Sequence, residues 1–523
     1  MLGNNSDTIL RGVFMGLNFA LLRCSSIDLR NTIVILLVAQ IIFLAPKSFA
    51  IESAEKPKTV IENSIAVLPF ENLSPNPDDA YFAVGVHQEI LDTLTKIKDI
   101  SAITRLSVLR YVSDDRPISD IASELNVETI MKGRVGFADN QMTFELQLFD
   151  ASNNDQLWSD VFERDLSDIF KTQSEIIGHI TTALGAEVTA AEQQRIENIP
   201  TDSLEAYSVY LRAKAVPSII GIVKPHTFYE YLEQAIALDP DFALAHAYKA
   251  RGYAFAKRVA RRIKGLTPEE MERVALEHAE IALALDPNLG LAYRAKADIH
   301  RSHQRETAAK EAFEKALQFN PNDVEILGSY ARSFTALEQH DVAAKISRRV
   351  LELAPNDANN YYLLGRALMY GGDLASAAKQ FRLGNSIEPN FYRYLNLCLA
   401  EFLLENNAEA EEAIRHAEQL IDASITTRGT SRVAYAYSRL GLSKDAQRVF
   451  NLVEARVAKG NFISGEIRAL SYLAIGEIEK AYIALSMKQK EGITFLKEIK
   501  ANSLHNPVLE EPRFIELRKL MGS

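Results

Sequence analysis

Few residues in this sequence are spaced for catalysis or for metal binding. His300 and His303 stand three residues apart, but no acidic ligand motif accompanies them, so a solvated helix face is the favoured interpretation. His87 and Glu89 could form an acid–base pair, for which an ordinary surface position is the favoured alternative. The sequence contains no phosphate-binding or dinucleotide-binding glycine motif, no HExxH, no GxSxG and no CxxC. We therefore expect no catalytic residues, no cofactor, no metal site and no enzyme activity.

Composition and charge narrow the class of protein further. The chain has 523 residues, of which 47% are hydrophobic and 24% are charged, as in folded globular proteins. Its net charge of −11 argues against nucleic acid as a partner, because phosphate binding needs a cationic face. The two cysteines are Cys24 and Cys398, and Cys398 is left alone if the N-terminus is removed on export, which excludes a disulfide framework.

The N-terminal 50 residues predict the compartment. Residues 32–45, TIVILLVAQIIFLA, follow Arg30 and precede small residues at 48–50, a pattern typical of a cleaved signal peptide. The apolar run is shorter than the about 17–25 residues of a transmembrane helix, so an uncleaved anchor at 32–50 remains the alternative. The region before the apolar run is long for a signal peptide, and Met15 would serve as a later start. Both alternatives place the rest of the chain in the periplasm, either free or anchored in the inner membrane.

A repeat governs the second half of the chain. The phrase EQAIALDPDFALAHAY returns as EIALALDPNLGLAYR, and 34 residues separate each of the prolines that close the later copies. These prolines are Pro287, Pro321, Pro355 and Pro389. Pro240 precedes the first of them by 47 residues, because residues 257–270 are inserted. A period of 34 resembles that of the tetratricopeptide repeat (TPR).

One copy explains the period physically. In residues 358–389 Tyr361, Leu364 and Leu368 share one helix face, and two glycines then break the chain. Ala377 and Phe381 mark one face of a second helix. Such a hairpin can bury its apolar face only against its neighbours. We expect an all-α TPR solenoid of about seven hairpins over 203–500, followed by a C-terminal tail or cap over 501–523.

A different pattern precedes the repeats. After a linker over 51–63, residues 64–200 predict an α+β module with a small mixed sheet. The expected elements are a strand at 64–70, a helix at 79–98, a strand region at 99–111, a helix at 117–127, strands at 128–138 and 141–152 around a two-residue turn, a strand at 155–165 and a long helix from about 166 to 196.

This α+β module resembles the TolB amino-terminal-domain-like (FlgO-like) family. The phrases that carry the resemblance are IAVLPFENLSP, AYFAVGVHQEIL, ELNVETIMKGRV, LQLFDASNNDQLWSDVFERDLSDIF and the C-terminal NPVLEEPRFIELRKLMG. In that family the same two modules often follow a membrane segment. A winged-helix DNA-binding domain, as in CadC-like regulators, or a nucleotide cyclase domain often stands in front. About 31 residues precede the apolar segment here, so we expect neither output domain.

The TPR resemblance also implies a binding groove. In such arrays the first helix of each hairpin lines the concave face, and its ninth position points into the groove. The residues carried over are Arg251, Asp298, Arg332 and Arg366, with Arg294 at a fifth position. Guanidinium groups there would suit an acidic peptide, while the alternative is that they are solvated or pair with Asp298 and Glu325. The lysine and asparagine pattern of the family's carboxylate clamp is not reproduced.

The insertion carries a basic face of its own. Its cations are Lys257, Arg258, Arg261, Arg262 and Lys264. They could contact an anionic membrane surface or an acidic partner, although a solvated helix end is the favoured interpretation.

Three functions follow from these patterns. The leading one is a non-enzymatic periplasmic TPR protein that binds protein or peptide partners as an adaptor, assembly factor or sensor. The alternative is a membrane-anchored signalling component, related to CadC-like or adenylate-cyclase-linked receptors, that acts through a partner output protein. The third is an enzyme with an unrecognised site, which a deep polar pocket within residues 64–200 would favour.

Overall fold

The computed structural model describes residues 60–112, 116–216, 225–254, 267–422, 424–461 and 463–486, together with Pro512 and residues 514–516. The predicted signal segment and the basic residues 257–264 lie outside these described residues. Within them, no helix is both long enough and apolar enough to span a membrane. The described residues from Val60 onward form one compact unit, which holds both the α/β module and the repeats.

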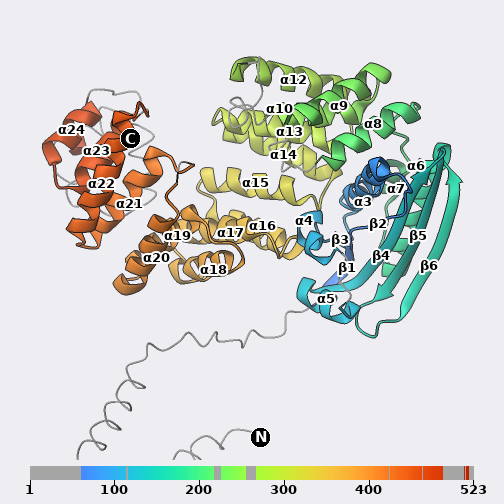
Figure 1. The fold of residues 1–523 in the computed structure, drawn as a ribbon, viewed down its shortest axis with the longest axis horizontal. Coiled ribbons are helices and arrows are strands. Elements are labelled where there is room, and N and C mark those ends of the chain that lie inside the picture. The colour runs from blue at the N-terminus through green and yellow to red at the C-terminus, as the bar shows by residue number, and fades with distance from the viewer. Residues whose placement is uncertain are drawn as a thin grey trace, which may run out of the picture. The chain divides into compact units, whose positions relative to one another are not determined.

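A small mixed sheet forms the framework of the α/β module, as predicted (Figure 1). Its strand order is β3-β1-β4-β5-β6, and β2 also pairs with β4. Strand β1 runs parallel to its neighbours β3 and β4. Strand β5 runs antiparallel to its neighbours β4 and β6. The strands are β1 (Ile61–Val67), β2 (Glu71–Asn72), β3 (Ser101–Ala102), β4 (Val127–Ala138), β5 (Gln141–Asp150) and β6 (Gln156–Asp165). β1 begins inside the stretch that was expected to be a linker.

Alternation along the strands decides which sheet face each helix covers. Met142, Phe144, Leu146 and Leu148 of β5 are all buried in one core, while the residues between them are polar. Helices α3 (Ala80–Leu94) and α6 (Ile169–Leu184) contribute apolar residues to that core. Helices α4 (Arg105–Val108) and α5 (Ile118–Leu125) contribute to a second core, which also contains Ile130 of β4.

The turn between β4 and β5 confirms the predicted two-residue hairpin. Asp139 and Asn140 have φ angles of 49° and 65°. Two successive residues with positive φ give the tight turn whose twist matches that of the flanking strands, and asparagine and aspartate tolerate this conformation.

Two predictions for the module were wrong. Residues 99–111 do not form one strand region, because only Ser101 and Ala102 pair with β1 and α4 follows with a 3-10 turn at Leu109–Tyr111. The expected helix from 166 to 196 is broken at Gly185, whose φ of 64° ends α6. Helix α7 (Ala190–Ile196) then begins after a new capping box formed by Thr189 and Glu192.

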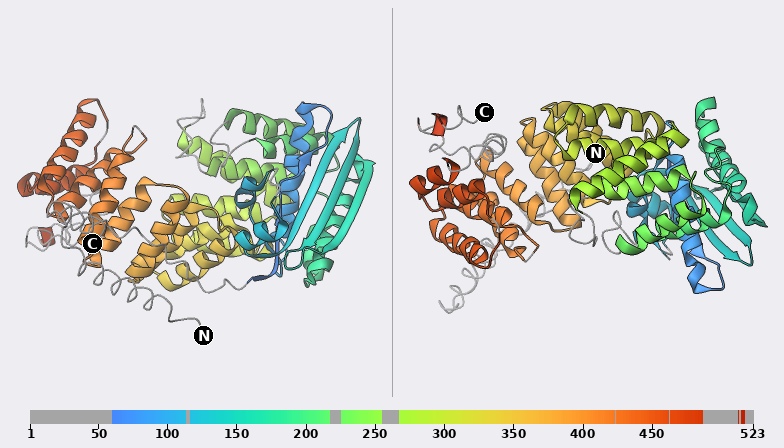
Figure 2. Two further views of the ribbon diagram at one scale, coloured as in Figure 1. Left: turned by 60° about the horizontal axis from the view of Figure 1, so that its bottom comes forward. Right: turned by 90° about the horizontal axis from the view of Figure 1, so that it is seen from above.

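The rest of the described chain is an array of paired helices (Figures 1 and 2). The described residues contain eight pairs, where the sequence predicted about seven hairpins. They are α8 (Leu204–Ala215) with α9 (Pro225–Leu238), α10 (Ala243–Ala254) with α12 (Pro268–Leu285), α13 (Gly290–Ser302) with α14 (Glu306–Phe319), α15 (Val324–Ala336) with α16 (His340–Leu353), α17 (Ala358–Tyr370) with α18 (Leu374–Ile387), α19 (Phe391–Leu403) with α20 (Asn407–Gln419), α21 (Thr427–Arg439) with α22 (Ser443–Ala458), and α23 (Gly465–Ala474) with α24 (Ile478–Ser486).

Close packing inside a pair explains the small residues of the repeat. A Cβ atom added to Gly365 of α17 would lie 2.6 Å from the Phe381 ring of α18, closer than real carbon atoms approach. At the C-terminal end, Phe514 is buried and its ring meets that of Tyr482 edge-on. Phe514 thus packs on α24 of the last helical pair.

The array also packs against the α/β module through the loops that join its repeats. Asn322 donates to the carbonyl oxygens of Ile97, Lys98 and Ile100 at 3.0, 3.0 and 2.7 Å. Asn356, one period of 34 residues later, donates to the carbonyl oxygen of Ser107 at 3.4 Å. The same loop position of two consecutive repeats therefore binds the module, and the repeat period spaces these contacts.

We expect Asn322→Ala to lower the free energy of unfolding by about 2–3 kcal/mol, because the buried carbonyl groups of Ile97 and Ile100 lose their donor. Asn288→Ala is the matched control, since Asn288 occupies the same loop position one repeat earlier and is exposed. It should change stability by less than about 0.5 kcal/mol. Urea unfolding followed by circular dichroism measures both variants, and equal effects would contradict the assigned role of Asn322.

Candidate functional site

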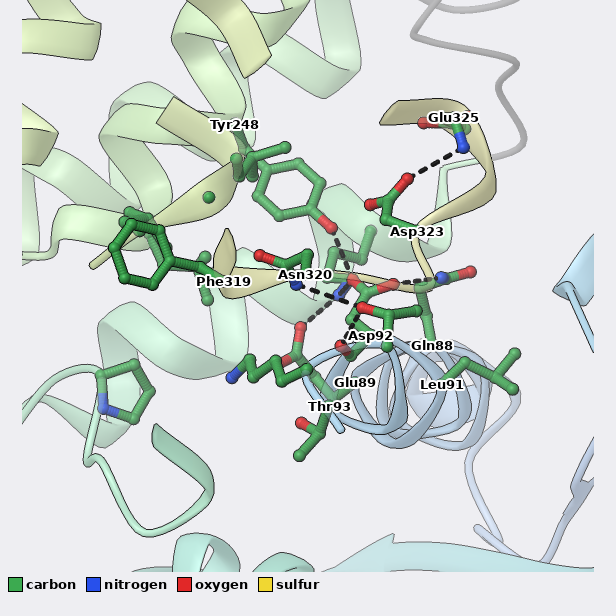
Figure 3. A pocket seen from close by; sticks show the side chains of 18 of the residues that line it. Gln88, Glu89, Leu91, Asp92, Thr93, Tyr248, Phe319, Asn320, Asp323 and Glu325 are labelled. Carbon is green, nitrogen blue, oxygen red and sulfur yellow. Dashed lines mark hydrogen bonds and ion pairs between the residues drawn. The ribbon is translucent and has the colours of Figure 1, made fainter. Parts of the chain in front are cut away.

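The α/β module and the first repeats enclose a cavity of about 1350 Å³ (Figure 3). The module contributes the C-terminal half of α3, residues 102–106 and α7 to its lining. The array contributes Tyr248 on α10, the loop residues 285–291 and residues 318–325. Cavities shared by two domains are a common place for ligand sites in proteins.

A buried lysine joins the two sides of this cavity. Lys214 of α8 has a side chain only 1% exposed, and its Nζ donates to Asp92 Oδ2 at 2.6 Å and also to Glu89. The Tyr248 hydroxyl of α10 donates to Asp92 Oδ2 at 2.8 Å, and the Tyr210 hydroxyl of α8 donates to Glu89 at 2.9 Å. Figure 3 shows Tyr248 reaching Asp92 from the array. We call these five residues the Lys214 cluster.

Electrostatics keeps the Lys214 cluster charged. Burial acts to raise the pKa of Asp92, but the Lys214 charge and hydrogen bonds from Lys214, Gln88 and Tyr248 lower it below its usual value. Burial acts to lower the pKa of Lys214, but the nearby carboxylates of Asp92 and Glu89 raise it well above its usual value. The ion pair therefore persists at neutral pH despite its burial.

The predicted groove residues Arg251, Arg294 and Asp298 lie together in one ion-pair network. Arg251 and Arg294 both donate to Glu325, and Arg294 Nε lies 3.6 Å from Asp298 Oδ2. Burial acts to raise the pKa of Glu325, but the two arginines lower it to about 2. This pairing is the alternative that the sequence left open. A peptide-binding role for these residues stays a prediction.

The other two predicted groove residues lie outside this network. Arg366 of α17 stacks over Tyr370, with 5.3 Å from its Cζ to the ring centroid, and donates to the Tyr370 hydroxyl at 3.3 Å. Arg332 is exposed on α15. The structure brings Arg251 to the cavity wall, whereas Arg332 and Arg366 do not line this cavity.

The histidines do not form the sites considered from the sequence. His87 is buried rather than on the surface, so the surface interpretation was wrong; its Nε2 hydrogen-bonds to the Val67 carbonyl oxygen at 2.9 Å. Burial lowers the pKa of His87 to about 4. His303 Nε2 lies 2.5 Å from Glu272 Oε1. Among the described residues, no three histidine, cysteine or acidic side chains are placed to hold a metal ion.

Sequence reasoning missed the residues that unite the module with the array. Lys214 was one of several cations in a helical stretch, and nothing in its spacing marked it as buried. Asn322 and Asn356 do carry a signal, because both follow the repeat proline directly, in the phrases NPND and APND. From the sequence, these phrases were interpreted only as part of the helical repeat and not as contacts with the α/β module.

Comparison with known proteins agrees with the helical architecture. The tetratricopeptide repeat profile matches residues 290–323, which include α13 and α14. The fold of the described helical half resembles a TPR solenoid, and residues 290–323 match the repeat itself. The curated relatives described next match only parts of this chain. The resemblance of the α/β module to the TolB-like family stays a prediction.

Two curated relatives match parts of the chain. "Putative adenylate cyclase 3" of Rhizobium meliloti (strain 1021) is 31% identical over 191 residues, which cover 36% of this chain and 32% of that protein. "Small glutamine-rich tetratricopeptide repeat-containing protein 2" of Mycosarcoma maydis is 30% identical over 83 residues, which cover 16% of this chain and 24% of that protein. The chain thus spans about a third and about a quarter of the length of these relatives.

Segments of the chain are also similar to solved structures. YrrB, described as a TPR protein with an unusual peptide-binding site, is 24% identical, covers 36% of this chain and 90% of its own, and gives a TM-score of 0.29. PilF of Pseudomonas aeruginosa is 15% identical, covers 45% of this chain and 98% of its own, and gives a TM-score of 0.34.

We expect Lys214→Met to destabilise the protein by about 2–3 kcal/mol, because Glu89, whose side chain is 12% exposed, and the half-exposed Asp92 would lose their counter-ion. Lys249→Met is the matched control, since Lys249 of α10 pairs at 3.2 Å with Glu233, whose side chain is 56% exposed. It should cost less than about 1 kcal/mol. Urea unfolding measures both variants, and a Lys214→Met protein as stable as the control would refute the role of the Lys214 cluster.

Proposed function

We propose that this protein binds protein or peptide partners in the cavity between the α/β module and the TPR array, as an adaptor, assembly factor or sensor. The cavity carries this proposal. Its volume of about 1350 Å³ exceeds that of an ordinary small-molecule site, and residues of several consecutive hairpins line one side of it. Stacked hairpins build extended binding surfaces, which suit a length of polypeptide.

The chemistry of the cavity favours binding over catalysis. Three of its carboxylates, Glu89, Asp92 and Glu325, are each held by a cationic side chain in an ion pair. A general acid or base must exchange its proton freely with a substrate, which a tightly paired group does poorly. We therefore propose that the described part of the chain has no enzymatic activity.

A signalling role is the second candidate. It is favoured by the 31% identity to the relative named "Putative adenylate cyclase 3", over 191 residues. In this account the chain is a membrane-anchored component, and binding in the cavity is passed to an output protein. Such a role needs the apolar segment 32–50 to be retained.

A selected peptide tests partner binding directly. Peptides chosen by phage display against the full chain are labelled and titrated by fluorescence anisotropy. Thr93→Trp should weaken their binding about tenfold or more, because Thr93 lines the cavity and tryptophan fills space there. Ala408→Trp is the control, since Ala408 is exposed on α20. If no peptide is selected, or if both variants bind as the wild type does, the proposed function is wrong.

We also propose that the chain is exported, on the strength of the apolar run 32–45 with its basic flank and small residues at 48–50. Cell fractionation with sequencing of the mature N-terminus measures this. The expected result is a periplasmic protein that starts at Ile51, and retention of residues 32–50 in the inner membrane would favour the signalling role. A cytoplasmic chain with an intact N-terminus contradicts export.

A further inference from the structure

We infer that the partner is an acidic peptide with aliphatic residues, and that its carboxylates bind Lys96, Arg105 and Arg195 of the α/β module. The inference rests on the proposed function, whose cavity it shares. It differs from the sequence expectation, in which arginines of the array would make these contacts. In this proposal the cations of the α/β module select an acidic peptide, and the array forms the other wall of the cavity.

The array arginines are already neutralised. Arg294 is buried between Glu325 and Asp298, with its side chain 3% exposed. Arg251, the predicted groove residue that lines the cavity, is also bound to Glu325. A ligand carboxylate would have to displace Glu325 from both arginines, so these positions are poor anchors for an acidic partner.

The three module cations have donors to spare. The Lys96 ammonium has no hydrogen bond or ion pair within the described part of the chain, although the charges of Glu89 and Asp92 act on it at longer range. The Nε atoms of Arg105 and Arg195 are buried and have no hydrogen-bond partner among the described residues. Arg195 Nη2 donates to the Lys96 carbonyl oxygen at 3.3 Å, which places these two residues side by side.

For two of these cations, Lys96 and Arg105, burial outweighs the attraction of nearby carboxylates. Burial lowers the pKa of Lys96 from its usual value, even though nearby carboxylates act in the opposite direction. Burial also lowers the pKa of Arg105, against the charge of Asp92. A buried cation without a paired anion is unfavourable, and a ligand carboxylate would relieve this cost.

Apart from the exposed Asp241, the acidic residues of the cavity wall hold a cation or accept from backbone N–H groups, so a ligand would supply the acceptors that the three module cations lack. Lys214 holds Glu89 and Asp92. Asp323 Oδ1 accepts from the backbone N–H groups of Glu325 and Ile326, as a helix N-cap. Asp286 and Asp357 likewise accept from backbone N–H groups two residues further on.

Exposed aliphatic side chains define the rest of the ligand. Four large aliphatic residues line this cavity and remain 37–59% exposed: Leu106, Leu109, Ile199 and Leu285. Together with donors from three cations, they match a peptide in which aliphatic and acidic residues alternate. A small inorganic anion would leave this apolar surface uncovered.

The test titrates the full chain with two fluorescein-labelled octapeptide pools. One pool contains leucine, valine, aspartate and glutamate, and in the other asparagine and glutamine replace the acids. We expect the acidic pool to bind about tenfold tighter or more, and Lys96→Gln combined with Arg105→Gln to abolish that preference. The control combines Lys132→Gln on β4 with Arg273→Gln on α12, which removes the same charge outside the cavity and should keep the preference.

The outcomes separate the two proposals. If neither pool binds while displayed peptides do, the acidic aliphatic ligand is wrong and partner binding stands; if no displayed peptide binds either, the proposed function fails. Three results would show that the assignment to Lys96 and Arg105 is wrong while partner binding stands. In the first, both pools bind the wild-type chain equally, and in the second, the cavity variant keeps the preference for the acidic pool. The third such result is a control variant that also loses the preference for the acidic pool.

A second measurement on the wild-type chain covers the case in which the cavity variant does not fold. A carbodiimide joins a carboxylate to a neighbouring amine as an amide, with loss of water to the reagent. With an acidic peptide from the first pool, mass spectrometry should find the cross-link on Lys96. Cross-links confined to lysines outside the cavity would overturn the inference.

Discussion

The ion pairs of the buried Lys214 determine how the α/β module packs against the helical array, because a buried ammonium group needs a counter-ion. Lys214 belongs to the first helix of the array, and its carboxylate partners Glu89 and Asp92 belong to the module. Moving these charges apart would leave Lys214, whose side chain is 1% exposed, desolvated without a counter-ion, at a cost of several kcal/mol. The position of α3 against α8 is therefore fixed, and the cavity beside them keeps its shape.

The repeat period extends this constraint along the array. Asn322 and Asn356 lie 34 residues apart, and each binds backbone carbonyl groups of the module. The stacking of hairpins thus sets the spacing of the donors, and the segment 97–107 follows it. The same segment carries Arg105 into the cavity wall.

Much of the fold could be predicted from the sequence because it depends on local chemistry. The 34-residue period gave the paired helices, and Asp139 with Asn140 gave the hairpin turn. The failures have tertiary causes. Residues 103–111 had the apolar content of a strand, but Thr104 donates its N–H to the Leu353 carbonyl oxygen of the array and the chain turns into α4. Gly185 and the capping-box residues Thr189 and Glu192 are signals for a helix break in the sequence. The helical pattern on both sides of Gly185 nevertheless led to the prediction of one continuous helix.

The candidate site was predicted only in part. A groove on the array was expected, and Arg251 lines the cavity, but the pairing of the arginines with Glu325 depends on side chains 74 and 31 residues away in sequence. A single sequence does not show which of its charged residues lack a counter-ion in the folded protein. The unpaired cations of the module could be identified only after the acidic residues had been assigned to their partners.

The central claim is that the α/β module and the TPR array fold as one body around the cavity. Trp158, the single tryptophan, lies on β6 of the module and stacks on His179 of α6, so its fluorescence reports the module alone. Circular dichroism at 222 nm reports mainly the helices of the array. Urea unfolding of the full chain followed by both signals should give one coincident transition. Two transitions with separate midpoints would show that the halves unfold independently, and the account would be wrong.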